Sequence, residues 1–119
     1  MNVRTPTVTM TDQTFTRDSA GLPAAVGTRV IDLGDRATYE LEAAPVRKRI
    51  GEAEVRMLAY NGSVPGPTLR VGQDSAVTVN FTNRTDMEAT VHWHGVRLDN
   101  RFDGTHHTQP PVNVGESFT

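Results

Sequence analysis

Two histidines that lie two residues apart are the side chains in this sequence best suited to chemistry. His92 and His94 flank Trp93 in a stretch from Glu88 in which apolar and polar residues alternate. Successive side chains of a strand point to opposite faces, so both imidazoles would share one face, with Cα atoms roughly 7 Å apart. From that separation, two imidazoles can hold one metal ion or reach two neighbouring ions. The opposite face, which carries Trp93, is predicted to cover the core of the domain.

The pair by itself is weak evidence for a metal site, because exposed or hydrogen-bonded histidines on a strand account for it equally well. Gly95 follows the pair and permits close backbone approach, which suits a metal site but also any strand end. His106 and His107 are adjacent, and adjacent side chains of an extended chain point apart, so we predict two solvated loop residues. Asp103 and Gly104 on their own are equally well interpreted as a turn.

The segments that must position these side chains have the two-residue period of β-strands. The alternation begins at Thr38, changes parity after Pro45, and returns in several short segments separated by Gly, Pro and Asn turns. The predicted strands cover residues 38–50, an edge strand with a bulge or bend at Pro45, then 54–59, 69–71, 77–82, 88–94 and a last one from about Ser117. No segment from Thr38 onward keeps a helical period, so the fold class is predicted to be all-β, a sandwich or barrel.

Two regions differ in pattern. Residues 1–37 mix Thr, Asp, Gly and Pro without a sustained period, and we predict a leader or extended arm there. Residues 38–119 are predicted to form the N-terminal part of a β-domain. Because the strand that starts near Ser117 is cut off, we expect a sandwich that is incomplete at its C-terminal end.

The composition of the chain excludes several classes of partner and of metal site. A chain of 119 residues accommodates one ordinary domain, and its net charge of −2 is scattered, so neither a nucleic-acid nor a membrane-surface partner is expected. No apolar run approaches the roughly 20 residues of a spanning helix, and no signal peptide is visible. The chain has no cysteine, which excludes disulfides and any thiolate-ligated metal within it.

The histidine pair stands within a series of short motifs spread over residues 38–119. The motifs are Tyr60-Asn61-Gly62, Pro65-Gly66-Pro67-Thr68-Leu69-Arg70-Val71, His92-Trp93-His94-Gly95, Asp103-Gly104, Thr108-Gln109-Pro110 and Val114-Gly115-Glu116-Ser117-Phe118-Thr119. In letters and spacing this series resembles the first cupredoxin domain of laccase-like multicopper oxidases. The resemblance implies a cupredoxin-like Greek-key β-sandwich, and residues 1–37 carry none of it.

The resemblance also implies roles for individual residues. His92 would ligate the type 2 copper and His94 one copper of the type 3 pair, as two of eight histidines around a trinuclear cluster. Asp103 stands where the family places an acidic residue that assists proton delivery while dioxygen is reduced to water. That role requires a carboxylate close to the metal site.

A laccase-like enzyme needs more than this chain contains: a second His-x-His, two further ones in its last domain, and a type 1 copper bound by cysteine. We therefore expect the 119 residues to be inactive alone. Their expected partners are further cupredoxin domains of the same protein or of another subunit, dioxygen, and an electron donor such as a phenol, an aromatic amine or a metal ion. The expected location is the periplasm or the cell exterior.

Two alternatives stay open at this point. The chain could be a small standalone β-module that binds copper or zinc through His92 and His94 without turnover, or a remnant without catalysis. Continuation of the chain into a second His-x-His would select the enzyme. Stoichiometric metal binding by the isolated residues would favour the module.

Overall fold

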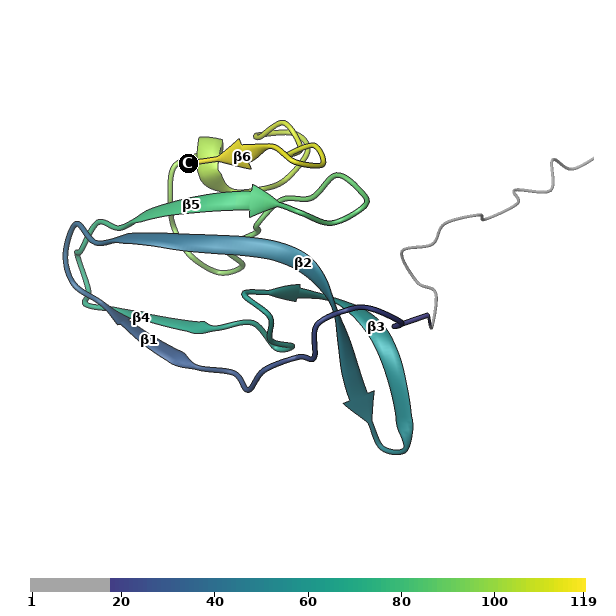
Figure 1. The fold of residues 1–119 in the computed structure, drawn as a ribbon. Helices are drawn as coiled ribbons and strands as arrows, with labels where there is room; N and C mark the ends of the chain where they lie inside the picture. Colours follow the sequence, from purple (N-terminus) through teal and green to yellow (C-terminus); the bar gives the residue numbers. More distant parts are fainter. Residues whose placement is uncertain (1–17) are drawn as a thin grey trace, which may run out of the picture.

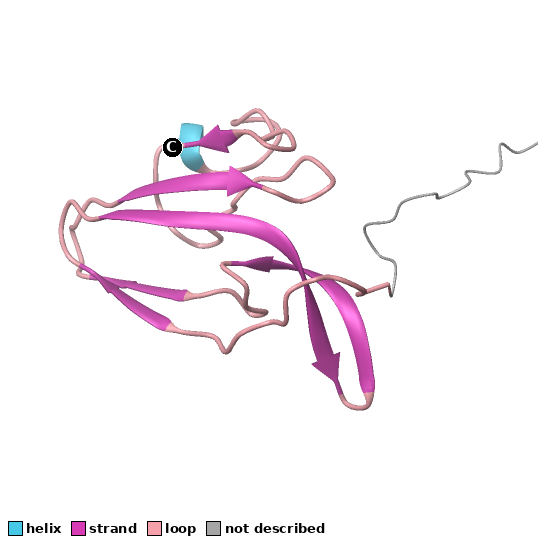
Figure 2. Ribbon diagram, in the orientation of Figure 1, coloured by secondary structure: helices cyan, strands magenta, loops and turns pink. Residues whose placement is uncertain are grey.

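The computed structural model describes residues 18–119, and its regular structure consists of short strands and one 3₁₀ helix (Figure 1, Figure 2). The elements are β1 (Val30–Leu33), β2 (Thr38–Ile50), β3 (Ala53–Tyr60), β4 (Thr68–Val71), β5 (Thr78–Asn83), η2 (Asn100–Phe102) and β6 (Ser117–Phe118). The predicted all-β fold class is confirmed. Over residues 18–119 no helix has the length and hydropathy needed to cross a bilayer.

The strands form two sheets. The larger sheet has the order β3-β2-β5-β6, in which β2 is antiparallel to β3 and parallel to β5, and β5 is antiparallel to β6. The smaller sheet pairs β1 with β4 in parallel. In Figure 1 the β1–β4 layer runs beneath β2 and β5, so the two sheets are the layers of a sandwich.

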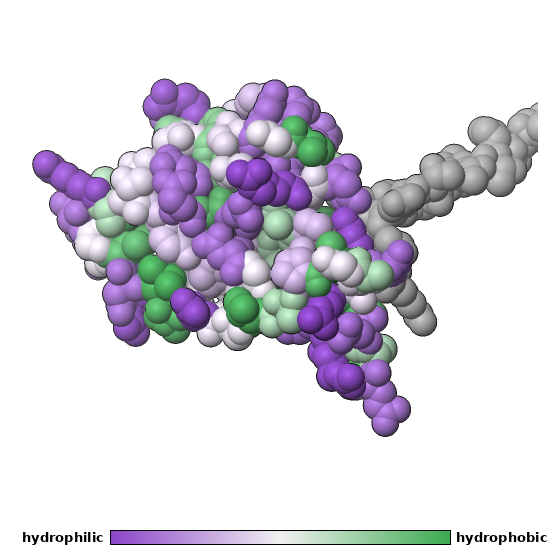
Figure 3. All heavy atoms as spheres, in the orientation of Figure 1, coloured by the Kyte–Doolittle hydropathy of each residue, from purple (hydrophilic) through white to green (hydrophobic). Residues whose placement is uncertain are grey.

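Strand β2 belongs to two parts of the larger sheet. It pairs with β5 up to Ala43 and with β3 from Ala43 onward. The buried side chains change parity across Pro45, from Leu41 and Ala43 to Val46, as the sequence predicts. Figure 1 shows β2 curving away from β5 in this region, so the predicted bend is confirmed. The β2–β3 hairpin protrudes beyond the sandwich, and Figure 3 shows its tip covered by hydrophilic residues.

The part of the predicted arm that the structure describes contains a strand that sequence analysis did not identify. Residues of β1 are aligned with β4, and the Arg70 Nη2 atom donates to Asp32 Oδ2 at 2.9 Å. This hydrogen bond from Arg70 holds the pKa of the Asp32 carboxyl below its usual value. The first residues of the arm, 1–17, lie outside the described residues, and the boundary at residue 37 between arm and domain stays a prediction.

The core lies on one face of the larger sheet. Leu41, Ala43, Phe81 and Val112 form its buried centre. The rings of Tyr60 and Phe81 meet edge to face, with centroids 6.2 Å apart, a favourable arrangement for two aromatic side chains. Ala89 and Val91 pack against this centre, so the segment that leads to the histidines is attached to the core.

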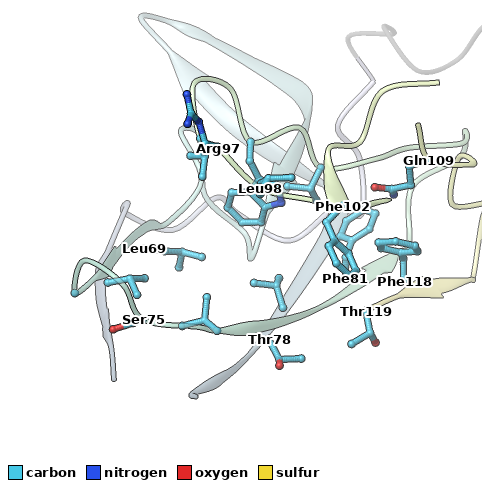
Figure 4. A pocket seen from close by; sticks show the side chains of 17 residues that line it. Leu69, Ser75, Thr78, Phe81, Arg97, Leu98, Phe102, Gln109, Phe118 and Thr119 are labelled. Atoms are coloured by element: carbon cyan, nitrogen blue, oxygen red, sulfur yellow. The ribbon is translucent and has the colours of Figure 1, made fainter. Parts of the chain in front are cut away.

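Between β4, β5 and residues 91–102 the core opens into an apolar hollow of about 670 Å³ (Figure 4). Leu69 lines it from β4, and Phe81 and Phe118 line it from β5 and β6. Val91 and Trp93 also line the hollow. One side of the histidine-bearing segment is thus a wall of the apolar interior, as predicted for Trp93.

Asn83 at the end of β5 is fully buried and hydrogen-bonded at both ends of its amide. Its Nδ2 donates to the carbonyl oxygens of Met87 at 2.8 Å and Val112 at 2.9 Å. Its Oδ1 accepts from the backbone N–H and the hydroxyl of Thr85, at 3.0 and 2.7 Å. A single side chain therefore ties the loop after β5 to the segment that carries Val112.

We expect Asn83→Ala to lower the free energy of unfolding by about 3 kcal/mol, because buried partners lose their hydrogen bonds without gaining water. Urea unfolding of the natural protein measures this. Asn113→Ala removes an exposed amide that donates to Glu116, and should cost less than about 0.5 kcal/mol. Equal costs for the two variants would contradict the role of Asn83.

Candidate metal centre

The histidine-bearing segment is extended but is not the strand that the sequence predicts for residues 88–94. Its one bridge joins Ala89 to Val112, through hydrogen bonds of 3.0 and 2.9 Å. The next carbonyl, of Thr90, accepts from the Tyr60 hydroxyl at 3.1 Å rather than from a backbone amide. The hydrogen bond from the Tyr60 side chain thus takes the place of the backbone pairing that a strand would have at Thr90. Burial raises the pKa of Tyr60, which keeps its hydroxyl protonated as a donor.

The predicted alternation of faces is confirmed although the ladder is absent. Val91 and Trp93 are partly buried, whereas His92 and His94 are exposed. The two imidazole rings lie close together, with centroids 5.6 Å apart and planes at 86°. Gly95, with φ of +79°, lies in the turn that ends the segment, where the Val96 N–H donates to the Trp93 carbonyl. The chain therefore presents two neighbouring imidazoles on the outside of the domain.

His92 is held in one orientation by the backbone of Asp103. Its Nδ1 lies 2.7 Å from the Asp103 carbonyl oxygen. A carbonyl only accepts, so Nδ1 carries a proton, and in the neutral ring Nε2 then keeps its lone pair. A hydrogen bond from the non-ligating nitrogen to a carbonyl is the usual way in which proteins orient a metal-binding histidine.

The side chain of Asp103 lies beside the same ring. Its Oδ2 is 3.6 Å from His92 Nδ1, and the Asp103 and His92 side chains are 27% and 44% exposed, so solvent reaches the carboxylate beside the ring. Asp103 terminates η2, where its N–H donates to Asn100. The chain bends at Asp103 after η2, and the same residue contacts the histidine through its carbonyl, whereas its role in proton delivery stays a prediction.

Gly104 brings the turn against the histidine segment. It has a φ of +78°, and a Cβ added to it would lie 2.1 Å from the carbonyl oxygen of Val91. Its N–H donates to Gln109 Oε1 at 3.0 Å, and its carbonyl accepts from Thr90 Oγ1 at 2.7 Å. Sequence analysis did not identify Thr90 or Gln109 as parts of the site. Thr90 shares the parity of the two histidines, which was a usable signal.

The other two histidines lie apart from this arrangement. His106 and His107 are exposed residues of the turn between Thr105 and Thr108, as expected for solvated loop residues. In the part of the chain that the structure describes, no three His, Cys, Asp or Glu side chains are grouped to hold a metal ion. The site therefore offers two imidazoles and one nearby carboxylate, which is a partial ligand set.

Comparison with known proteins identifies the family. The multicopper oxidase family model matches residues 42–119. The chain belongs to the multicopper oxidase family. Among relatives, Multicopper oxidase MmcO of Mycobacterium tuberculosis is 35% identical over 86 residues, which are 72% of this chain and 17% of that protein. Copper resistance protein A of Pseudomonas syringae pv. tomato is 31% identical over 81 residues, 68% of this chain and 13% of that protein.

Solved structures agree. Lac15 from a marine microbial metagenome is 41% identical, with a TM-score of 0.64 over 68% of this chain and 23% of its own. A crystal structure of a multicopper oxidase, 26% identical, has a TM-score of 0.60 over 88% of this chain and 39% of its own. The predicted resemblance and the cupredoxin-like β-sandwich are therefore confirmed, and a copper cofactor follows from the family. The chain spans less than a fifth of the length of the two curated relatives above.

Proposed function

We propose that this chain is the N-terminal part of a laccase-like multicopper oxidase, in which His92 and His94 ligate copper. The observation that carries the proposal is the fixed orientation of His92. Its Nδ1 is bound to the Asp103 carbonyl at 2.7 Å, so Nε2 is the nitrogen left for a metal, beside the exposed ring of His94. Membership of the family supports copper as the metal.

The residues present fit copper as a partial site. Imidazole is a ligand that suits copper, and two of them on one exposed face suit a site shared with another part of the structure. We assign His92 to the type 2 copper and His94 to one copper of the type 3 pair of a trinuclear cluster. When bound, copper supplies the one-electron chemistry by which phenols, aromatic amines or metal ions are oxidised while dioxygen is reduced to water.

Asp103 has two functions in this proposal. Its backbone carbonyl holds His92, and its carboxylate, 3.6 Å from the ring, accepts and releases protons at Oδ2. Reduction of dioxygen to water consumes protons, and a partly exposed carboxylate beside the site can relay them from solvent. We assign Asp103 as the catalytic acid and base.

The remaining ligands must come from elsewhere, because residues 18–119 group no third ligand with the pair. Further cupredoxin domains, in the same polypeptide or in another subunit, are the proposed source. Their faces would meet the exposed side of His92 and His94. The periplasm or the cell exterior is the proposed location of the complete enzyme.

The test is removal of copper from the natural protein that carries these residues. We expect a chelator to reduce dioxygen consumption with a phenolic, aromatic amine or metal-ion donor to background. Addition of copper should restore it, because the cluster carries the electrons. Addition of zinc, which has no redox chemistry, is the control and should not restore it. A protein that binds copper or zinc but consumes no dioxygen with any donor would instead be a metal-binding module.

A further inference from the structure

One peptide unit connects His92 to a buried side chain. The carbonyl of the Asp103–Gly104 peptide accepts from His92 Nδ1 at 2.7 Å, and the N–H of the same peptide donates to Gln109 Oε1 at 3.0 Å. Gln109 is only 4% exposed. Because a trans peptide is planar, with its C=O and N–H pointing in opposite directions, the bond to Gln109 Oε1 sets the direction of the carbonyl toward His92 as long as that oxygen faces the peptide.

The backbone alone does not choose this orientation. Rotating the peptide by half a turn mainly changes ψ of Asp103 and φ of Gly104, and glycine accepts both signs of φ. The rotated peptide would present its N–H to His92 and its carbonyl to Gln109. Nδ1 would then act as an acceptor, and the ring would carry its proton on Nε2, the nitrogen proposed to bind copper.

We propose that Gln109 is a positioning residue of the copper site, which acts through the Asp103–Gly104 peptide to keep Nε2 of His92 free for the metal. This inference rests on the proposed function. Thr90 secures the other side of Gly104, where its hydroxyl donates to the glycine carbonyl at 2.7 Å. Hydrogen bonds that share a peptide polarise one another, so the chain from Gln109 to His92 strengthens each of its links.

The test compares two variants of nearly equal size. Gln109→Met keeps the length of the side chain and loses the oxygen acceptor, whereas Gln109→Glu keeps an oxygen in the same place. For Gln109→Met we expect the affinity of the His92 site for copper to fall about 10- to 100-fold. The spectrum of the type 2 Cu(II) that His92 is proposed to ligate measures this affinity. In the copper-free protein, nitrogen NMR should show that the His92 proton has moved toward Nε2. Gln109→Glu should retain the proton on Nδ1 and most of the affinity.

A variant of the core separates positioning from general stability. Val112→Ala truncates a buried side chain of the core cluster and opens a cavity there, so it should lower the melting temperature without moving the His92 proton. If Gln109→Met does not fold, Gln109→Asn, which withdraws the amide by one methylene group, carries the same expectation. An unchanged proton position in the folded variant would overturn the inference, as would equal losses in Gln109→Glu and Gln109→Met.

The two proposals fail in different ways. If the unaltered protein binds no copper at His92, the proposed function is wrong, whatever Gln109 does. If copper binds and Gln109→Met leaves both affinity and proton position unchanged, only the positioning role is wrong. The NMR measurement on copper-free protein thus tests Gln109 independently of catalysis.

Discussion

Gly104→Ala is expected to lower the free energy of unfolding by more than about 3 kcal/mol and to separate Asp103 from His92. The new Cβ would lie 2.1 Å from the carbonyl oxygen and 2.6 Å from the carbonyl carbon of Val91. Both are backbone atoms, so no side-chain rotation relieves the overlap. The turn must move away, and the 2.7 Å bond between His92 and the Asp103 carbonyl is then lost. Urea unfolding and copper analysis of the natural protein measure the two effects.

Gly115→Ala is the matched control. Gly115 has a φ of +83°, close to that of Gly104, but a Cβ there would meet nothing within 4 Å. The control therefore carries only the cost of a left-handed backbone for alanine, about 1 kcal/mol. If both variants lost the same stability and kept the same copper, the close approach of Gly104 to Val91 would have no consequence.

The alternation of apolar residues predicted most of the larger sheet, because burial on one face of a strand is a local property of the sequence. The change of parity across Pro45 shows how far this extends, since it predicted the burial of Leu41, Ala43 and Val46, whereas Ile50 at the tip of the hairpin is exposed. The pattern does not show which segment supplies hydrogen bonds. Residues 91–94 alternate in exposure, but within residues 18–119 they have no ladder partner.

Strand β1 was missed for the same reason. Its four residues alternate too briefly to stand out from the surrounding turns, and they form a strand because β4 lies alongside. The ion pair of Asp32 with Arg70 joins residues that are 38 positions apart in the chain. Such pairing depends on tertiary structure, which local periodicity cannot reveal.

The exposed placement of the two histidines was predictable, but the contacts that hold His92 were not. The spacing of His92 and His94 placed both on one exposed face, as the structure shows. The contribution of the Asp103 backbone could not be foreseen, because it depends on the path of a loop that Gly104 brings against Val91. Gln109 stands within the motif Thr108-Gln109-Pro110, but nothing in the sequence indicates that its side chain accepts from the Gly104 N–H.

His92→Ala is expected to remove mainly the type 2 copper, and His94→Ala to disrupt the type 3 pair, in the natural protein. Each should reduce dioxygen consumption by at least about 100-fold, because loss of a ligand should cost no less than loss of the outer-shell partners that orient it. Both side chains are exposed, so the variants should fold, with stability lowered by about 1 kcal/mol or less. Copper analysis, spectra of the remaining copper and oxygen uptake measure the result.

His106→Ala and His107→Ala are the matched controls, because they also remove exposed imidazoles. Among the described residues, no group of three metal-binding side chains includes these two histidines. They should keep the copper content and the rate. Full dioxygen reduction by His92→Ala or His94→Ala with copper intact would exclude the pair as ligands. Loss of copper in a control variant would instead place the metal near residues 105–108 and refute the assignment of those histidines to solvent. The four variants therefore distinguish a copper site at His92 and His94 from one in the turn of residues 105–108. Only the first site requires the imidazole of His92, which the Asp103 carbonyl binds.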